Sequence, residues 1–317
     1  MNKIKKFTQK IFKNKTQEET RNGLYASLEE LMDMRKYVGY VQKSRKLKSY
    51  SENSGDISSV FKGRGIEMEE IREYGFGDDV RDIDWRVTAR KEKPYTKVYQ
   101  EERDHEIYVW LDLSSIMLFG SKKELKSVTS SKLAALLGWV ALNNKDKFGC
   151  IIFDGEQSWL FKPKHDRAYL AAILKKITEV SQKSLKNAYN DDENRIKSLK
   201  LLQSTVKNKA GVFVITSFGY WSDACDVELS GLAKKTKMCM INVFDQLEEK
   251  APVSGQYMAE YNGQKLVFDS SSKTYRKEYA MYFAKKREDR ERFCRRFGCK
   301  MINFSSDMGY GSWVKIL

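Results

Sequence analysis

The residues best suited to chemistry stand at the end of an apolar run. Ile107-Tyr108-Val109-Trp110-Leu111 is followed at once by Asp112-Leu113-Ser114-Ser115. If the run forms a buried strand, these polar side chains lie beyond its carboxyl end, where open α/β sheets bind their ligands. Carboxylate and hydroxyl oxygens are ligands that hard cations prefer. The pattern therefore predicts a metal-ion loop around Asp112 and Ser114.

A second block, between residues 63 and 90, is dense in glycine, acid and arginine. Its candidate residues are Arg72, Asp78, Asp79, Arg81, Asp84, Trp85 and Arg90. Such groups must be paired if they are buried, and arginine can bind a carboxylate through two parallel hydrogen bonds. One interpretation is a structural network that locks this segment against the main domain, with Trp85 covering the joint. The other is a docking surface for a protein partner, and both can hold together.

A catalytic interpretation has little support from the residue types. Paired carboxylates could serve acid–base chemistry, but no histidine lies near them and no Gly-rich phosphate loop appears. The histidines are His105 and His165, and none of the five cysteines has CxxC spacing. We therefore expect no enzyme activity, ATP binding, zinc site or disulfide framework, and we expect a reducing compartment.

The formal net charge of +15 is concentrated at the N-terminus, since residues 1–48 hold thirteen Lys and Arg against five Asp and Glu. Within residues 1–16, apolar side chains fall on one side of a helix and lysines on the rest, which is typical of a helix lying on an anionic membrane. The predicted membrane-surface residues are Lys3, Lys5, Lys6, Phe7, Lys10, Ile11 and Phe12. The alternative is a basic tail that docks weakly or not at all. Nucleic acid is not expected as a partner, because no nucleic-acid motif appears.

The hydropathy pattern predicts an α/β fold with a doubly wound, mostly parallel sheet. Expected helices cover residues 22–42, 123–144, 168–177, 191–207, 226–236 and 273–297. Expected strands cover residues 107–111, 148–153, 212–216, 238–244 and 300–304, with hairpin partners at 158–161 and at 257–261 with 265–268. Residues 57–100 are expected to form short strands and turns, not helices. We divide the chain into a basic N-terminal helical region (1–50), a β-rich Arg/Asp segment (51–104) and the α/β domain (105–317).

These motifs resemble the bacterial domain-of-unknown-function 58 family, von Willebrand factor A-like proteins associated with MoxR AAA+ ATPases. The resemblance spans roughly residues 20–305. It is carried by Gly63-Arg64-Gly65, Glu67, Arg72-Glu73-Tyr74, Gly77-Asp78-Asp79-Val80-Arg81, Ile83-Asp84-Trp85, Thr88-Ala89-Arg90, Glu101-Glu102-Arg103, Leu111-Asp112-Leu113-Ser114, Phe119-Gly120, Lys126-Ser127-Val128, Asp146-Lys147-Phe148-Gly149 and Asp245-Gln246-Leu247-Glu248.

The resemblance implies a von Willebrand factor A fold, in which a strand-end DxSxS loop binds a divalent cation with help from a Thr and a second Asp. Hard oxygen ligands of this kind suit Mg²⁺. In this chain Ile116 stands at the second Ser position, and Ser217 follows the later strand where an acid is often found. The implied Mg²⁺ site at Asp112 and Ser114 is therefore degenerate. The alternative is a relic loop in which Asp112 bonds backbone amides and Ser114.

The resemblance further implies a non-enzymatic adaptor or co-chaperone of a MoxR-type AAA+ ATPase, acting in complex assembly or in envelope and stress tolerance. Other von Willebrand-type proteins are further expected partners. The alternative is a peripheral membrane-binding module that uses the basic N-terminus, and a divalent-cation-dependent binding protein ranks last. We expect the chain in the cytoplasm, with peripheral attachment at the inner membrane through residues 1–16.

Overall fold

The computed structural model describes residues 23–42, 66–91, 93–101, 105–187, 189–261, 264–309 and 312–313. The predicted membrane-surface residues, Lys3, Lys5, Lys6, Phe7, Lys10, Ile11 and Phe12, lie outside these ranges. The Gly63-Arg64-Gly65 start of the ionic block lies outside them as well.

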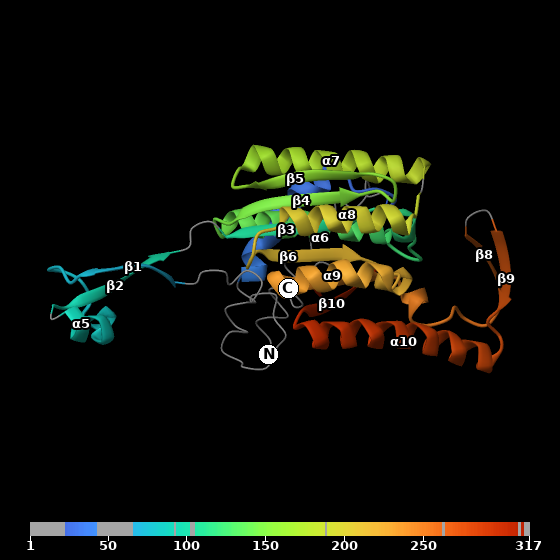
Figure 1. The fold of residues 1–317 in the computed structure, drawn as a ribbon. Coiled ribbons are helices and arrows are strands. Elements are labelled where there is room, and N and C mark those ends of the chain that lie inside the picture. The colour runs from blue at the N-terminus through green and yellow to red at the C-terminus, as the bar shows by residue number, and fades with distance from the viewer. Residues whose placement is uncertain are drawn as a thin grey trace, which may run out of the picture.

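A six-stranded sheet forms the centre of the molecule (Figure 1). Its strands are β3 (Glu106–Asp112), β4 (Lys147–Phe153), β5 (Ser158–Lys164), β6 (Gly211–Thr216), β7 (Lys237–Phe244) and β10 (Lys300–Ser305). The spatial order is β10-β7-β6-β3-β4-β5, and every neighbouring pair is parallel except β4 with β5. The predicted doubly wound, mostly parallel sheet is confirmed.

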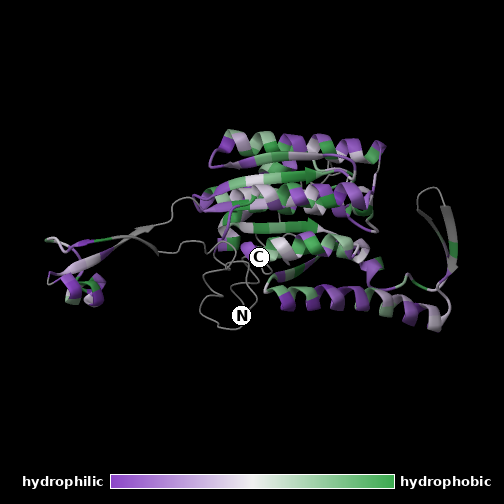
Figure 2. Cartoon of the chain, viewed as in Figure 1, coloured by the Kyte–Doolittle hydropathy of each residue, from purple (hydrophilic) through white to green (hydrophobic). Residues whose placement is uncertain are grey.

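Helices cover both faces of this sheet, because its strands are apolar on both sides. They are α6 (Lys126–Asn143), α7 (Arg167–Lys186), α8 (Asp192–Thr205), α9 (Ala224–Lys235) and α10 (Lys273–Phe297). Along β3, the side chains of Ile107, Val109 and Leu111 share a core with α6 and α7. Tyr108 and Trp110 share the opposite core with α8, α9 and α10. Figure 2 shows the matching contrast between the apolar strands and the largely hydrophilic α10.

The segment before the main domain is also part of the first core. The helix α2 (Leu28–Asp33) begins at Ser27 with a capping box, and a 3-10 turn, η2 (Met34–Tyr37), interrupts the single helix expected over 22–42. Leu31 is fully buried, and the indole N–H of Trp139 in α6 donates to its carbonyl at 3.2 Å. Residues 23–42 therefore pack with the α/β domain rather than as a separate region.

The Arg/Asp segment forms a small unit of its own. The strands β1 (Ile66–Glu73) and β2 (Tyr95–Glu101) pair antiparallel, and a helix, α5 (Trp85–Lys91), lies in their connection. Because β2 ends shortly before β3 begins, the unit is tethered at the amino ends of the parallel strands, and it stands apart from the main sheet in Figure 1. The expectation that this segment lacks helices is wrong. Asp84 starts α5 by accepting the N–H groups of Arg86 and Val87.

A second small hairpin precedes α10. It pairs β8 (Gln256–Tyr261) with β9 (Gln264–Asp269), as predicted, and stands off the body in Figure 1. The helix α10 then starts at Ser272, whose hydroxyl accepts the N–H of Tyr275, and ends at Gly298 in the left-handed region at φ 67°. Within the described ranges, no helix is both long and apolar enough to cross a bilayer.

Candidate functional site

The carboxylate of Asp112 lies at the carboxyl end of β3, between β4 and β6, and is fully buried. One of its oxygens, Oδ1, accepts the N–H of Ser114 at 2.9 Å. The other, Oδ2, accepts the hydroxyl of Thr216, from the end of β6, at 2.6 Å. The strand ends therefore bring together the predicted residues Asp112 and Ser114 with Thr216.

A fully buried arginine faces the same carboxylate. Nε of Arg195 lies 4.0 Å from Oδ2 of Asp112, and its guanidinium binds the side chains of Asp192 and Asn190. The aromatic rings of Phe153 and Trp221 flank the guanidinium, each with its centroid 5.9 Å away. Arg195 comes from the first turns of α8, where an isolated sequence gives no sign that an arginine is buried.

A buried lysine lies at the same edge of the sheet. Nζ of Lys126, at the start of α6, is 2.5 Å from Oε1 of Glu248 and donates to the hydroxyl of Ser217 at 3.0 Å. Burial lowers the pKa of Lys126, while the negative charges of Glu248, Asp245 and Asp112 oppose that shift. The ring of Tyr220 caps the ammonium group at 5.0 Å.

The motif Asp245-Gln246-Leu247-Glu248 places both of its acids at this edge. The side chain of Asp245 accepts hydrogen bonds from Leu247 N–H, from Ser121 N–H and hydroxyl, and from the hydroxyl of Ser306. Burial alone would raise the pKa of Asp245, but these hydrogen bonds outweigh it and lower the pKa. Glu248 completes a capping box by accepting the N–H of Asp245.

These residues do not fit a Mg²⁺ ion. The hydroxyl of Ser114 is buried without a hydrogen-bond partner among the described residues, which alone would favour a ligand. However, both oxygens of Asp112 are already engaged, Nε of Arg195 lies 4.0 Å from one of them, and Asp112 also interacts electrostatically with Lys126. Octahedral Mg²⁺ needs several free oxygens and net negative charge. Ile116 supplies no oxygen, and no cluster of three or more Asp, Glu, His or Cys suited to a metal occurs in the described part of the chain.

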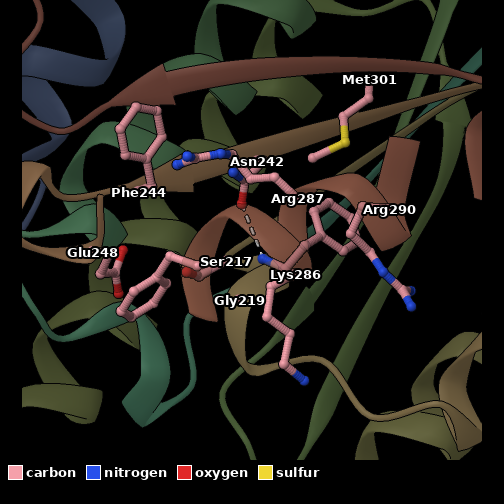
Figure 3. Close-up of a pocket in the computed structure, with 11 residues that line it drawn as sticks. Ser217, Gly219, Asn242, Phe244, Glu248, Lys286, Arg287, Arg290 and Met301 are labelled. Carbon is pink, nitrogen blue, oxygen red and sulfur yellow. Dashed lines mark hydrogen bonds between the residues drawn. The ribbon is translucent and has the colours of Figure 1, made fainter. Parts of the chain in front are cut away.

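A shallow pocket, partly open to solvent, lies next to this edge under α10 (Figure 3). Ser217 and Asn242 line it from the strand ends, and Asn242 accepts the N–H of Phe218 at 3.0 Å. Figure 3 shows the side chains of Lys286 and Arg290 extending away from Asn242. Arg290 is bound to Asp226 of α9, so we assign no charged ligand to this pocket.

The ionic block makes its pairs within the β1–β2 unit. Nη2 of Arg72 lies 2.8 Å from Oδ1 of Asp78, and Nε of Arg81 lies 3.3 Å from Oδ1 of Asp79. Asp84 pairs with Lys97 at 3.5 Å rather than with an arginine. The pairs are single contacts between partly exposed groups, so each contributes little to stability by itself.

The acids of the block shape the connection between β1 and β2. The other oxygen of Asp78 accepts the N–H of Gly75 at 2.8 Å, and this bond, with the charge of Arg72, lowers the pKa of Asp78 against partial burial. The N–H bonds from Val87 and Arg86, together with Lys97, likewise lower the pKa of Asp84.

The prediction that this network locks the segment against the main domain is wrong. Among the described residues, the ion pairs of the block all lie within the unit, Trp85 is 67% exposed, and Arg90 is exposed in the last turn of α5. Phe76, in the connection between β1 and β2, was not among the predicted site residues, and its side chain is fully exposed. The ionic block and the Asp112 site lie toward opposite ends of the strands, so they do not form one site (Figure 1).

The mostly parallel sheet and its two helical layers define a doubly wound α/β domain. The family described as "Protein of unknown function DUF58" matches residues 70–289. The chain belongs to this DUF58 family, as its motifs predicted.

Curated relatives include uncharacterised proteins of Mycobacterium bovis and Mycobacterium tuberculosis. Each is 28% identical over 128 residues, which is 40% of this chain and 40% of the relative. The chain thus spans about two fifths of the length of these relatives. Among solved structures, BatB from Bacteroides thetaiotaomicron is 16% identical with a TM-score of 0.42, over 67% of this chain and 94% of that one. The SpRpn10 VWA domain is 8% identical with a TM-score of 0.34, over 66% and 93%.

Proposed function

We propose that this chain is a non-enzymatic adaptor or co-chaperone of a MoxR-type AAA+ ATPase. It acts through protein–protein contacts in complex assembly or in envelope and stress tolerance, and other von Willebrand-type proteins are further partners. The supporting observation is the connection between β1 and β2, which carries Phe76, Val80 and Trp85 at 111%, 60% and 67% exposure. Exposed aromatic residues beside arginines are typical of the residues that dominate protein interfaces.

The ionic block supports this proposal because it pre-forms the connection. Asp78 ties the β1 end to the tip through Arg72 and Gly75, and Asp84 starts α5 directly before Trp85. A loop that is already ordered loses less conformational entropy when it binds. The acids therefore serve the docking surface indirectly, by holding Phe76 and Trp85 in place.

The charge of this surface indicates the kind of partner surface that it fits. The side chain of Arg81 is 90% exposed, and Arg86, Arg90 and Lys91 are exposed on α5. The same connection also carries Asp78, Asp79, Asp82 and Asp84, so its charges are mixed in sign. Groups of both signs around an apolar centre fit a partner surface of complementary charge. We therefore expect the ATPase to present both acidic and basic residues around an apolar pocket.

The arrangement of polar groups supports a binding role rather than catalysis. The Asp112 carboxylate is buried among Thr216, Ser114 and Arg195, and it has no open face for a substrate. The acids of the ionic block are engaged in local hydrogen bonds. A divalent-cation-dependent binding role is correspondingly less favoured than the adaptor role.

Binding to the purified MoxR-type ATPase of the same organism tests the proposal. Full-length chain with Phe76→Ser and Trp85→Ser should bind at least about tenfold more weakly, because interface hot spots contribute about 2 kcal/mol or more each. Val227→Ser is the matched control, since Val227 on α9 is 70% exposed but lies on the main domain. Equal affinity of the double variant and the control would contradict docking through this connection.

A second candidate function rests on the basic tail. Six lysines and no acid occur in residues 1–16, interleaved with Ile4, Phe7, Ile11 and Phe12. We propose that this tail holds the adaptor at the inner leaflet of the membrane, which keeps a cytoplasmic protein peripherally attached. Flotation with anionic liposomes compares the full chain with a form lacking residues 1–16. Equal binding by both forms would exclude the tail as the anchor.

A further inference from the structure

Two buried cations lie where the carboxyl ends of the parallel strands meet. Arg195 from α8 and Lys126 from α6 are both completely buried, and they approach from the opposite helical layers. Arg195 faces the carboxylate of Asp112, and Lys126 donates to Ser217 one residue beyond Thr216. Burying such charges is unfavourable unless each is paired.

We infer that Arg195 and Lys126 are built-in replacements for a divalent cation, so that this strand-end site is closed and works without metal. Arg195 balances the charge of Asp112, as a bound cation would, and Lys126 holds the hydroxyl of Ser217. The site thereby becomes a structural clamp that joins α6, α8 and the strand ends.

The chain between α7 and α8 fixes the position of Arg195. Its guanidinium is held by Asp192 and Asn190, and the carbonyl of Tyr189 accepts the N–H of Ser115 at 2.8 Å. The same carbonyl approaches Gly155 so closely that a Cβ there would lie 2.0 Å from it. The connection therefore covers the loop that follows β3, and it brings the arginine over Asp112.

The balance of charge argues against an added dication. The positive groups of Arg195 and Lys126 already face Asp112 and Glu248, and Asp192 is bound to the arginine. A dication next to Asp112 would be repelled by both cations in surroundings of low polarity. It would also have to displace the Thr216 hydroxyl from the carboxylate. The hydroxyl of Ser114 has no hydrogen-bond partner among the described residues. In a closed site it does not serve as a metal ligand.

The first test titrates full-length wild-type protein with Mn²⁺ and follows free Mn²⁺ by electron paramagnetic resonance. Asp112→Asn, which keeps the size of the side chain, is the comparison. We expect the wild type and the variant to leave the same free Mn²⁺ signal. Mn²⁺ bound by the wild type and released by Asp112→Asn would overturn the inference. A thermal midpoint of the wild type that rises with Mg²⁺ relative to EDTA, at matched ionic strength, would also overturn it.

The second test is a double-mutant cycle that combines Asp112→Asn with Arg195→Met, read by urea denaturation of the full chain. If the arginine balances Asp112, the two changes share one interaction and are not additive. We expect Asp112→Asn to reduce the ratio of folded to unfolded protein about tenfold less in the Arg195→Met background than in the wild type. Strictly additive effects would show that Arg195 does not act on Asp112. Arg195→Lys retains the charge, and it should fall between the wild type and Arg195→Met.

Discussion

Replacing Lys126 by Met should destabilise the protein far more than the loss of one surface charge. The ammonium group is fully buried 2.5 Å from Glu248, and at an effective dielectric constant of about 20 that attraction is about 7 kcal/mol. Desolvating two ions costs several kcal/mol each, so the intact pair contributes little net stability. Removing one partner is different, because Glu248 keeps its desolvation cost and loses its counter-charge. We expect Lys126→Met to lower the free energy of unfolding by about 3–5 kcal/mol.

Urea denaturation followed by far-UV circular dichroism measures this loss. Lys122→Met is the matched control, because Lys122 lies in the same connection with a 55% exposed side chain and pairs with Asp307 at 3.4 Å. We expect it to change the free energy of unfolding by less than about 1 kcal/mol. Combining Lys126→Met with Glu248→Gln should recover much of the loss, since the unpaired charge is gone. Equal losses for Lys126→Met and Lys122→Met, or a double variant less stable than Lys126→Met, would refute the reasoning.

Two further predictions concern the same edge of the sheet. Because the pKa of Asp245 is lowered in the folded state, its stabilisation is complete above its ordinary pKa of 3.8 and is lost as the pH falls through the lower folded value. Asp245→Asn should therefore lower the free energy of unfolding by about 2 kcal/mol around pH 7. Around pH 3 the variant and the wild type should differ less in this free energy. A difference that does not depend on pH would contradict the prediction. Gly155→Ala should cost about 2 kcal/mol or more in urea denaturation, because Gly155 has φ +97° and its Cβ would meet the carbonyl of Tyr189. Gly77→Ala is the control, because Gly77 has φ +105° but open space around it. If both variants lose the same free energy of unfolding, the loss comes from the backbone conformation and not from the clash with Tyr189.

The sheet and its long helices could be predicted because they depend on local patterns. The run from Ile107 to Leu111 is apolar at every position, as expected for a parallel strand covered on both faces. The helix α10 was expected at its observed limits, since Ser272 caps its start and Gly298 its end. A helix whose sequence marks both of its ends can be predicted without knowledge of its tertiary contacts.

The short elements were harder to predict. The seven residues of α5 lie in a stretch whose glycines and charged residues favour strands and turns. A cap at Asp84 was the available signal, because its side chain accepts two N–H groups of the first turn. Isolated helices of this length are marginal in water, so propensity alone could not predict it.

The strand-end site could be predicted only in part. Asp112 and Ser114 stand directly after an apolar run, but the burial of Arg195 depends on how α8 packs across β3 and β4. The position of Lys126 in the first turn of a helix was a sequence signal for this site. The helix dipole disfavours a positive charge there, so a nearby negative partner is expected. The Asp-x-x-Glu spacing of Asp245 and Glu248 was a second signal, since it is the pattern of a capping box.

Hydrogen–deuterium exchange of the full chain, with and without the MoxR-type ATPase of the same organism, tests the adaptor proposal most directly. Exchange resolves which amides a partner protects, so it locates the docking surface without any substitution. We predict that binding slows exchange in residues 74–91, around Phe76 and Trp85, while the strand ends around Asp112 do not change. Protection confined to the α/β domain, or no change at ATPase concentrations that saturate the chain, would contradict the proposal.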